Sequence, residues 1–478
     1  MATNASFAGP LAGSILTPAV SKMTTAGSYL DIQNDGWAKQ YLPELYESEV
    51  QRYGNRTISG FLSQISAEMP MSSDQVIWSE QGRLHLSYNG QINPVTGAVD
   101  TITGIDSGAS EVHAVRKGAT LVCEVNNIVF KAFVTVGVET SATALTIKPY
   151  GAANVDDLAG IAVTDNQVIK FFVYGSEFKK GTNGMSGSLE APKDIQTTTP
   201  IIIKDKYEVN GSDMAQIGWI EVTTENGATG YLWYLKSEHE TRLRFEDYLE
   251  TAMVEAVPAE GGSGAAAIVE GIASGVGNKG SEGLFYVVEE RGNVWSGGNP
   301  TTLGDFDAII QRLDKQGSIE ENVLFVNREF GFDIDDMLAA QNAGYAGGTS
   351  FGLFDNDEEM ALNLGFSGFR RGYDFYKTDW KYLNDPTMRG DIVGGAVNGV
   401  LVPAGSTTVY DQVLGKNAKR PFLHVRYRAS ETEDRRYKTW ITGSAGGAST
   451  SSLDAMEVNF LSERALCTLG ANNFFIFK

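Results

Sequence analysis

The clearest hydrophobic pattern in the chain lies between residues 231 and 256. Apolar side chains recur there at i, i+3, i+4, i+7, i+8 and i+11: Phe245, Tyr248, Leu249, Ala252, Met253 and Ala256. Side chains at this spacing share one face of an α-helix. The pattern predicts a single helix about 39 Å long at about 1.5 Å per residue. We expect its charged middle, Lys236 to Arg242, either to be solvated or to meet a charged surface on another subunit.

Shorter alternating runs between residues 108 and 175 are typical of strands. The runs recur at short spacing, at Ala119–Val125, Ile128–Val136, Thr143–Lys148 and Val168–Tyr174. Asn126-Asn127 and the region of Gly151 supply turns between them. The spacing predicts a separate all-β unit, a small barrel of about 65 residues, which is close to the lower limit for a domain with its own core.

Extended segments flank this unit on both sides. Residues 75–87 alternate and are followed by Asn89-Gly90, a strong hairpin signal. Residues 176–222 are rich in glycine and threonine, with a strand expected at Pro200–Ile203 and a turn at Asn210-Gly211. We therefore expect the barrel to be inserted between the two arms of one long hairpin.

The second half of the chain predicts helices and strands in alternation after a glycine- and alanine-rich loop, Gly261 to Gly283. Helices are expected at Leu303–Lys315, opened by a capping box from Thr302 to Asp305, and at Asp333–Asn342 and Asp355–Leu364. Strands are expected at Leu284–Val288, Val323–Val326, Phe422–Ala429, Arg435–Thr442 and Phe474–Phe477, with a hairpin over Ile392–Val402 that turns at Asn398-Gly399. The last of these strands, with three phenylalanines and an isoleucine, should lie in a core.

The first 60 residues mix glycine, proline, serine and threonine with isolated large apolar groups such as Trp37. Such a stretch cannot bury its own aromatic side chains. Two interpretations stay open: an arm that lies against another surface, or an irregular N-terminal part of the first domain.

Composition narrows the classes of function. The 478 residues, enough for two to four domains, carry 38 Lys and Arg against 59 Asp and Glu, a formal charge of −21 with a pI near 4.7. This balance argues against a protein that holds duplex DNA, which requires basic groups on phosphates. Two distant cysteines, Cys123 and Cys467, match neither a disulfide framework nor a zinc site. No apolar run approaches membrane-spanning length, and the N-terminus lacks the features of a secretory signal, so we expect a protein made and used inside a cell.

Two glycine motifs could carry chemistry. Gly275 to Gly280 matches the dinucleotide pattern G-x-G-x-x-G, but a small-residue loop precedes it and a strand-like run follows, whereas the mechanism needs a strand before and a helix after. Gly348 to Gly352 matches the nucleophile elbow around Ser350, with only His424 downstream as a base. In a chain with 54 glycines, we attribute both matches to chance.

Two acidic clusters and four histidines are the remaining candidates. Asp333-Ile334-Asp335-Asp336 and Asp355 to Glu359 could seat a calcium ion, but neither has the twelve-residue loop spacing, and helix N-caps explain both. The histidines are never paired at metal-ligand spacing: His85, His113, His239 and His424. The sequence therefore predicts no catalytic, cofactor-binding or metal site.

The expected elements follow one another in a specific order. They are an N-terminal arm, a long β-hairpin, one long spine helix, a mixed α/β middle and a β-rich C-terminal part. In this order the chain resembles the major capsid protein of tailed bacteriophages, with the Hong Kong 97-type fold. Two segments are similar in sequence to segments of capsid proteins from crAss-like and related podoviruses. They are residues 31–38 (Asp31-Ile32-Gln33-Asn34-Asp35-Gly36-Trp37-Ala38) and residues 376–383 (Tyr376-Lys377-Thr378-Asp379-Trp380-Lys381-Tyr382-Leu383).

The resemblance implies an α+β fold in four parts. These are an N-arm at 1–65, an E-loop at 66–222 with the inserted barrel at about 108–175, a P domain at 223–265 and 405–478, and an A domain at 266–404. The barrel departs from the minimal family fold. No basic helical scaffolding segment is found at the N-terminus, so the resemblance places scaffolding on a separate protein.

The resemblance also implies a structural protein without enzymatic activity or cofactors. Such a protein assembles with itself into hexamers and pentamers of an icosahedral head, enclosing double-stranded DNA without sequence-specific binding and without a membrane. Its implied partners are portal, scaffolding and auxiliary or decoration proteins, and its location is the virion after assembly in the host cytoplasm. Two alternatives stay open: an encapsulin-like nanocompartment shell, and a serine hydrolase that uses Ser350.

Overall fold

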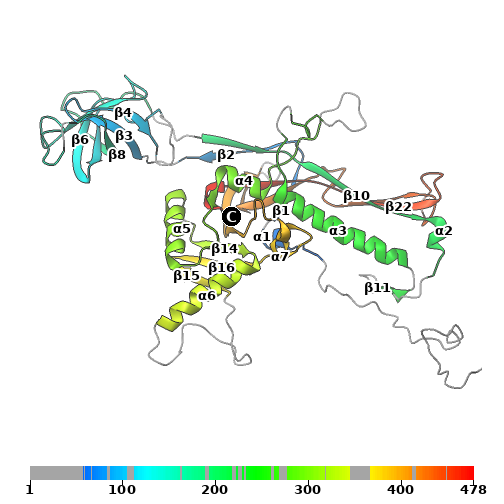
Figure 1. Cartoon of the computed structure of the whole chain (residues 1–478). Helices are drawn as coiled ribbons and strands as arrows, with labels where there is room; N and C mark the ends of the chain where they lie inside the picture. The colour runs from blue at the N-terminus through cyan, green and yellow to red at the C-terminus, as the bar shows by residue number, and fades with distance from the viewer. Residues whose placement is uncertain are drawn as a thin grey trace, which may run out of the picture.

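The computed structural model describes residues 57–478 apart from short gaps and one longer one. The residues outside the description are 1–56, 59, 66, 83–84, 86, 105–111, 162–163, 189–192, 218–221, 224–228, 231–232, 260–262, 268–276, 318, 345–366, 412–415 and 448. The expected N-terminal arm up to residue 56 and the expected helix at Asp355–Leu364 therefore lie outside the described residues. The described part is a mixed α and β structure with a body, a ribbon and a barrel (Figure 1).

A closed six-stranded barrel forms a separate unit of the described chain. Its strands, in the order β3-β4-β7-β6-β5-β8, are β3 (Ser87–Asn93), β4 (Ala98–Thr103), β5 (Ala119–Val125), β6 (Ile128–Val136), β7 (Leu145–Pro149) and β8 (Gln167–Ser176). The turn between β5 and β6 has Asn126 and Asn127 at φ of 50° and 63°, as a tight hairpin requires. Alternate side chains of the strands fill an interior core that the barrel shares with no other unit.

The barrel begins about twenty residues earlier than the sequence indicates. The expected hairpin turn at Asn89-Gly90 is wrong, because both residues lie inside β3, where the pairing with β4 shifts register between Asn89 and Gln91. A Cβ atom on Gly90 would lie 2.9 Å from the Val99 side chain. Gly90 therefore allows β4 to approach β3 closely at a bulge, and β3 continues through this residue.

A two-stranded ribbon joins the barrel to the body. It pairs β2 (Val76–Gln81) antiparallel with β9 (Lys193–Thr198), so all six barrel strands lie between its two arms in sequence. This confirms the expected insertion of the barrel into a long hairpin. In Figure 1 the barrel stands apart from the body at the end of this ribbon.

The first sheet of the body has five strands. They are β1 (Ala67–Met71), β10 (Ile201–Asn210), β20 (Leu423–Arg428), β21 (Lys438–Gly443) and β22 (Ala455–Thr468). The long strand β22 pairs with β10 along one edge and with β20 and β21 along the other, and β1 runs parallel to β20. Strand β22 was not predicted from the sequence, because it is buried along nearly its whole length and shows little alternation of apolar and polar residues.

The long helix α3 (Trp233–Glu255) lies along β10 and β22, as Figure 1 shows. Phe245, Leu249 and Met253 are buried on its sheet-facing side, and Phe245 stacks near Phe460 of β22. The expected helix and most of its apolar face are confirmed. Tyr248 is the exception, with its side chain 43% exposed; Asp247, Glu250 and Val254 are buried instead, so the buried side of the helix is displaced toward them.

The second sheet of the body has six strands in the order β13-β23-β17-β14-β16-β15. They are β13 (Asn293–Trp295), β14 (Glu321–Val326), β15 (Gly368–Arg371), β16 (Tyr373–Asp379), β17 (Gly399–Pro403) and β23 (Phe475–Phe477). The closing run of aromatic residues is buried in this sheet, as expected. Because β23 pairs with β13 and β17, the last residues belong with strands from 293–403 rather than with β20 to β22.

Helices cover both faces of the second sheet. They are α4 (Leu284–Arg291), α5 (Leu303–Gln316), α6 (Arg328–Gly344) and the short α7 (Lys381–Asn384). Along β14, Leu324 and Val326 pack toward α5 and α6, whereas Phe325 packs toward α1 (Phe61–Ile65) and α4. A sheet buried on both faces explains why the Val323–Val326 run is continuously apolar.

Two further expectations in this region are wrong. Residues 284–288 form the start of helix α4 and not a strand; Gly283 is the N-cap, and Leu284, Phe285 and Val288 pack into one core cluster. Asn398-Gly399 is no hairpin turn: Asn398 donates its backbone N–H to the Phe477 carbonyl, and Gly399 begins β17 against β14. A Cβ atom on Gly399 would lie 2.8 Å from the Phe325 carbonyl oxygen, so close packing requires this glycine.

Smaller elements complete the described chain. They are α2 (Gly211–Met214), the strand pairs β11 (Val222–Thr223) with β12 (Thr229–Gly230) and β18 (Ser406–Asp411) with β19 (Lys416–Pro421), and the 3-10 turns η3 (Arg389–Asp391) and η4 (Ala471–Asn473). The expected turn at Asn210-Gly211 coincides with the end of β10 and the start of α2. None of the described helices combines the length and the apolar character that a membrane crossing requires.

The predicted capping box at the start of α5 is confirmed. The Thr302 side chain accepts a hydrogen bond from the Asp305 backbone at 3.3 Å, and the Asp305 carboxylate accepts one from the Thr302 backbone at 3.0 Å. We expect Thr302→Ala to lower the free energy of unfolding by about 1 kcal/mol, because a helix N–H loses its partner. Urea unfolding measures the change, and Thr301→Ala, whose side chain makes no cap, is the matched control.

Candidate functional site

The chemical candidates in the sequence do not form a site among the described residues. Ser350 and the acidic cluster Asp355 to Glu359 lie outside them. His424, the base proposed for Ser350, is buried on β20 as a core position. Within the part of the chain that the structure describes, no group of three or more His, Cys, Asp or Glu could hold a metal ion.

The glycine motif at 275–280 has a different setting from the one expected. Gly275 and Val276 lie outside the described residues, and a helix rather than a strand follows, at Leu284. The N-terminus of this helix is already in contact with protein, because Gly283 donates its N–H to the Ala256 carbonyl at 2.8 Å. A Cβ atom on Gly283 would lie 2.6 Å from Ala256 backbone atoms, which leaves no space for a pyrophosphate at this position.

The acidic cluster at residues 333–336 lies in the second and third turns of α6. The expectation that it caps a helix is wrong, since α6 begins at Arg328 and its cap is Asn327, which accepts the Phe330 N–H at 2.8 Å. Asp333 accepts a hydrogen bond from Asn299, and Asp335 forms an ion pair with Lys377 at 2.5 Å. These carboxylates therefore fix α6 to its surroundings.

The four histidines lie in different elements, and His424 of β20 is the cross-strand partner of Cys467 of β22. His85 is exposed, His113 is buried with Nε2 3.0 Å from the Ala144 carbonyl oxygen, and His239 is half-buried on α3. Both cysteines are buried thiols that form no disulfide. Burial raises the pKa of the Cys123 thiol to about 12, so this side chain is an inert part of the barrel core.

The outward surface of the ribbon is the first candidate for binding another molecule. Its inner face is fixed to the body, where Glu80 accepts the Gly470 N–H at 2.9 Å and Thr199 donates to the Gly280 carbonyl at 2.9 Å. On the opposite face Ile77 and Ile195 are 60% and 66% exposed. They lie on neighbouring strands, because Ile77 pairs with Thr197 and Ile195 with Ser79. Two exposed isoleucines on neighbouring strands make this face of the ribbon a candidate contact surface.

A second candidate is the place where the N-terminal segment meets α3. The Asp247 carboxylate accepts the Ile58 N–H at 3.0 Å, and Glu250 accepts the N–H groups of Gly60 at 2.7 Å and Phe61 at 3.0 Å. Both carboxylates are nearly buried. The Phe61 ring in turn stacks on Trp380, with centroids 4.2 Å apart. Asp247 and Glu250 thus hold the start of the described chain against the long helix.

A polar cavity of about 990 Å³ adjoins this contact. Charges of both signs line it, among them Glu68, Glu250, Arg436 and Arg464. Arg464 is buried and donates to the Arg436 carbonyl at 3.1 Å, while its guanidinium lies 3.6 Å from the Glu68 carboxylate. Burial lowers the pKa of Arg464. The paired charges of the lining indicate a structural contact between α1, α3 and the sheet.

Glu250 provides a pH-dependent test of this contact. Burial raises the pKa of Glu250, partly offset by the backbone N–H groups that it accepts. A folded-state pKa above the unfolded value of about 4.3 means that the folded chain binds the proton more tightly, so its contribution is lost as pH rises through the folded value. We expect the free energy of unfolding of the wild type, relative to Glu250→Gln, to fall from pH 4 to neutrality. Denaturant unfolding over this range measures it, and Glu246→Gln is the control; a flat difference would contradict the burial of this carboxylate.

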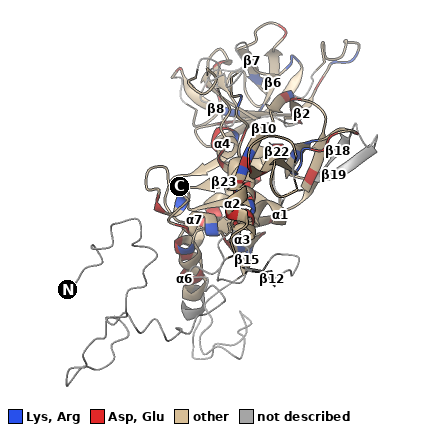
Figure 2. Cartoon of the chain, turned by 90° about the vertical axis from the view of Figure 1, so that its right-hand side faces the viewer, with Lys and Arg blue, Asp and Glu red and all other residues tan. Residues whose placement is uncertain are grey.

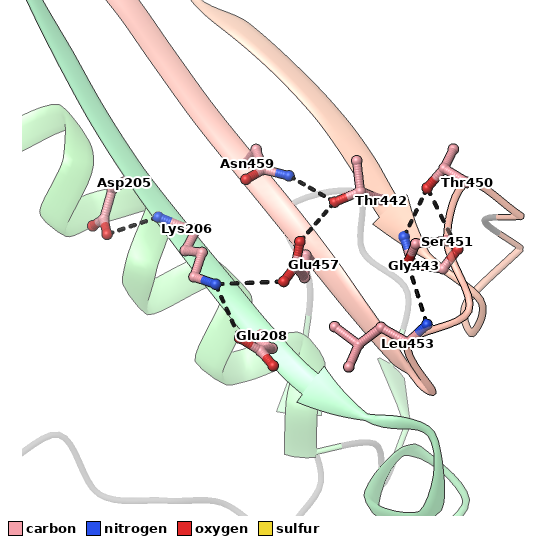
Figure 3. A network of polar contacts seen from close by, with 10 residues as sticks. All are labelled: Asp205, Lys206, Glu208, Thr442, Gly443, Thr450, Ser451, Leu453, Glu457 and Asn459. Atoms are coloured by element: carbon pink, nitrogen blue, oxygen red, sulfur yellow. Dashed lines mark hydrogen bonds and ion pairs between the residues drawn. The ribbon is translucent and has the colours of Figure 1, made fainter. Parts of the chain in front are cut away.

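A ladder of polar side chains crosses three strands of the first sheet (Figure 3). Lys206 of β10 pairs with Glu208 at 3.0 Å and with Glu457 of β22 at 3.4 Å, and Thr442 of β21 donates to Glu457 at 2.9 Å. Hydrogen bonding to Thr442 and then to Lys206 lowers the pKa of Glu457. At the end of β21, Gly443 has φ of 123° and donates to Thr450 at 2.9 Å. The ladder ties the edge strands to β22.

Charge is distributed in small, mixed groups over the body. Figure 2 shows basic and acidic positions interspersed over the body. Surface pairs such as Arg328 with Asp379, 2.7 Å apart, match this pattern. Although the whole chain has a net charge of −21, acidic and basic side chains form ion pairs that are interspersed over the described elements.

None of the residues that form these candidate surfaces could be recognised in the sequence from its residue type or from a motif. Ile77, Ile195, Asp247 and Glu250 are ordinary strand and helix residues in the sequence. For the two isoleucines, the signal was the alternation of β2 and β9, which places them opposite Trp78 and Gln196. The role of the two carboxylates becomes evident only from their tertiary contact with residues 58–61.

Comparisons with known proteins find similarity in structure only. No family model matches the chain, and no curated protein matches it in sequence. Among solved structures, a chain of Microbacterium phage Oxtober96 is 10% identical with a TM-score of 0.41, covering 94% of this chain and 99% of that chain. A chain in the asymmetric unit of the mature capsid of bacteriophage PhiM1 is 10% identical with a TM-score of 0.39, covering 92% of both chains. A chain of the capsid of an empty GTA particle is 8% identical with a TM-score of 0.35, covering 92% of this chain and 96% of that chain.

Proposed function

We propose that this chain is the major capsid protein of a tailed bacteriophage, with a Hong Kong 97-like fold, and that it assembles with itself into the hexamers and pentamers of an icosahedral head. The observation that carries the proposal is the ribbon. Its outward face carries two exposed isoleucines, Ile77 and Ile195, and the ribbon holds a complete barrel at its end (Figure 1). A two-stranded ribbon is marginally stable alone, so its exposed isoleucines need a neighbouring subunit.

The architecture supports the assignment of parts as well. In this proposal residues 1–65 are the N-arm, the ribbon and barrel within 66–222 are the E-loop, and α3 with the five-stranded sheet is the P domain. The helices and six-stranded sheet around β14 are the A domain. Strand β23 then belongs to the A domain, which modifies the boundary at residue 405.

The charge of the chain fits the proposed contents of the shell. A subunit of net charge −21 that lines a space filled with DNA makes little attractive contact with phosphates. The function then resides in repeated contacts between subunits, without enzymatic activity and without a cofactor. The proposal places the protein in the virion after assembly in the host cytoplasm, in contact with portal, scaffolding and auxiliary or decoration proteins.

Electron microscopy of the purified native assembly tests the proposal. We expect closed icosahedral particles, with a tail and enclosed double-stranded DNA. Tailless shells that enclose a cargo enzyme would favour an encapsulin-like nanocompartment instead. A chain that stays monomeric and reacts with a fluorophosphonate probe at Ser350 would contradict both shell functions.

A further inference from the structure

Strand β10 has one edge without a partner strand among the described residues. It pairs with β22 along its other edge and stands last in the strand order of the five-stranded sheet. With 10 residues it is a long edge strand, whereas proteins that block an edge commonly shorten it. Unpaired N–H and C=O groups along such an edge can pair with a further strand. The free edge of β10 is therefore a candidate contact surface.

Hydrogen bonds at two positions show which residues turn their backbone groups outward. The Gly211 N–H donates to the Asp454 carbonyl at 3.2 Å, so odd-numbered residues turn these groups toward β22. The Lys206 N–H donates instead to the carboxylate of Asp205 at 2.8 Å (Figure 3). The two directions alternate along an antiparallel ladder. The even-numbered residues of β10 thus present their N–H and C=O groups to the free edge.

The charges on this edge are incompletely matched within one subunit. Glu208 lies directly opposite Glu457 of β22, and like charges in this position repel each other. Lys206 reaches both carboxylates only from a diagonal position, at 3.0 Å and 3.4 Å. The Lys206 and Glu208 side chains are 55% and 41% exposed. A cation directly opposite Glu208 on an added strand would complete this row of charges.

A second copy of β10 supplies such a cation in one register. When two copies pair antiparallel around Tyr207, Lys206 of each copy lies directly opposite Glu208 of the other. The same register places Lys204 opposite the uncharged Asn210. Centring the pair on any other residue from 204 to 208 places two equal charges opposite each other. Because even-numbered residues meet even-numbered ones, a twofold axis perpendicular to the sheet generates the pair.

We propose that β10 pairs with β10 of a second copy of this chain, antiparallel and centred on Tyr207, so that two five-stranded sheets join into one continuous sheet. The outward N–H of Lys206 then donates to the Glu208 carbonyl of the second copy in place of the Asp205 carboxylate. The polar ladder of Figure 3 continues across the axis, from Glu457 through Lys206 to Glu208 of the second copy. The contact joins neighbouring subunits of the shell and thus rests on the proposed function.

Tyr207→Cys in the full chain tests the pairing. It places two thiols opposite each other at the axis, where oxidation by diamide joins them in a disulfide. Ile202→Cys is the matched control, because it is exposed on the same strand but the register sets its two copies far apart. The native cysteines are buried and give little background. In assembled shells we expect covalent dimers of Tyr207→Cys at a yield on the order of tenfold above the control, since paired strands have a high effective concentration.

Charge reversal tests the register. Glu208→Lys, added to Tyr207→Cys, places a lysine opposite Lys206 on both sides of the axis, and we expect the dimer yield to fall on the order of tenfold. Adding Lys206→Glu as well restores opposite charges and should restore the yield. Both variants keep a cation beside Glu457, and thermal unfolding of the subunits checks that they fold.

The outcomes separate this inference from the proposed function. Shells that form normally but give Tyr207→Cys dimers at the control level would overturn the pairing and leave the capsid function intact. A dimer yield that Glu208→Lys leaves unchanged, or that Lys206→Glu fails to restore, would overturn the register. If the chain forms no shells, the proposed function fails, and the same oxidation of the concentrated soluble protein decides whether the strands pair.

Discussion

Leu249→Asp is expected to abolish folding of the body. Leu249 is buried between α3 and the first sheet, in a cluster with Phe245, Val458 and Phe460. Truncating a buried leucine costs about 2–5 kcal/mol, and the variant adds a carboxylate without a partner in an apolar site. Thermal unfolding followed by circular dichroism measures the loss.

Tyr248→Asp is the matched control for this change. It adds the same charge one position earlier on α3, but at Tyr248, which is 43% exposed. We expect its unfolding temperature to stay near that of the wild type. Wild-type-like unfolding of Leu249→Asp would refute the assignment of the buried helix face.

A double substitution on the ribbon, Ile77→Asp with Ile195→Asp, is expected to prevent shell formation and leave the subunit folded. Both side chains point away from the body, so the variant disturbs no described core. In the assembled shell each aspartate would be buried against a neighbour without a partner, at a cost repeated in every subunit. Electron microscopy and thermal unfolding of the same preparation measure the two effects.

Two controls separate apolar contact from added charge. Ile77→Val with Ile195→Val keeps the surface apolar and should assemble. Asn183→Asp with Ser188→Asp adds the same two negative charges at exposed loop positions and should assemble as well. Closed shells from the double aspartate variant of the ribbon would contradict the role of this face.

The sequence predicted elements best where a local rule decides the structure. The capping box at Thr302, the turn at Asn126-Asn127 and the amphipathic spacing of α3 and α5 need no knowledge of distant residues. Asn-Gly pairs were poorer guides. At Asn89-Gly90 and Asn398-Gly399 the glycine permits another part of the chain to approach closely, and only the tertiary structure distinguishes this use from a tight turn.

Buried elements without alternation were the other source of error. Leu284 to Val288 has the composition of a strand, yet its place against Phe61 and Trp380 makes it a helix. Strand β22 is buried along nearly its whole length, so period-two alternation is weak there. The candidate surfaces lay beyond prediction for a related reason: exposure of Ile77 or Ile195 depends on what the rest of the fold covers.

The connectivity of the body sets an order of folding during synthesis. The barrel is one continuous stretch with its own core, so it can fold soon after its last strand is translated. Strand β1 must wait for β20, more than 350 residues later, and the second sheet lacks β23 until residues 475–477 are made. A growing chain therefore carries a finished barrel and the two strands of its ribbon on an unfinished body until translation is nearly complete.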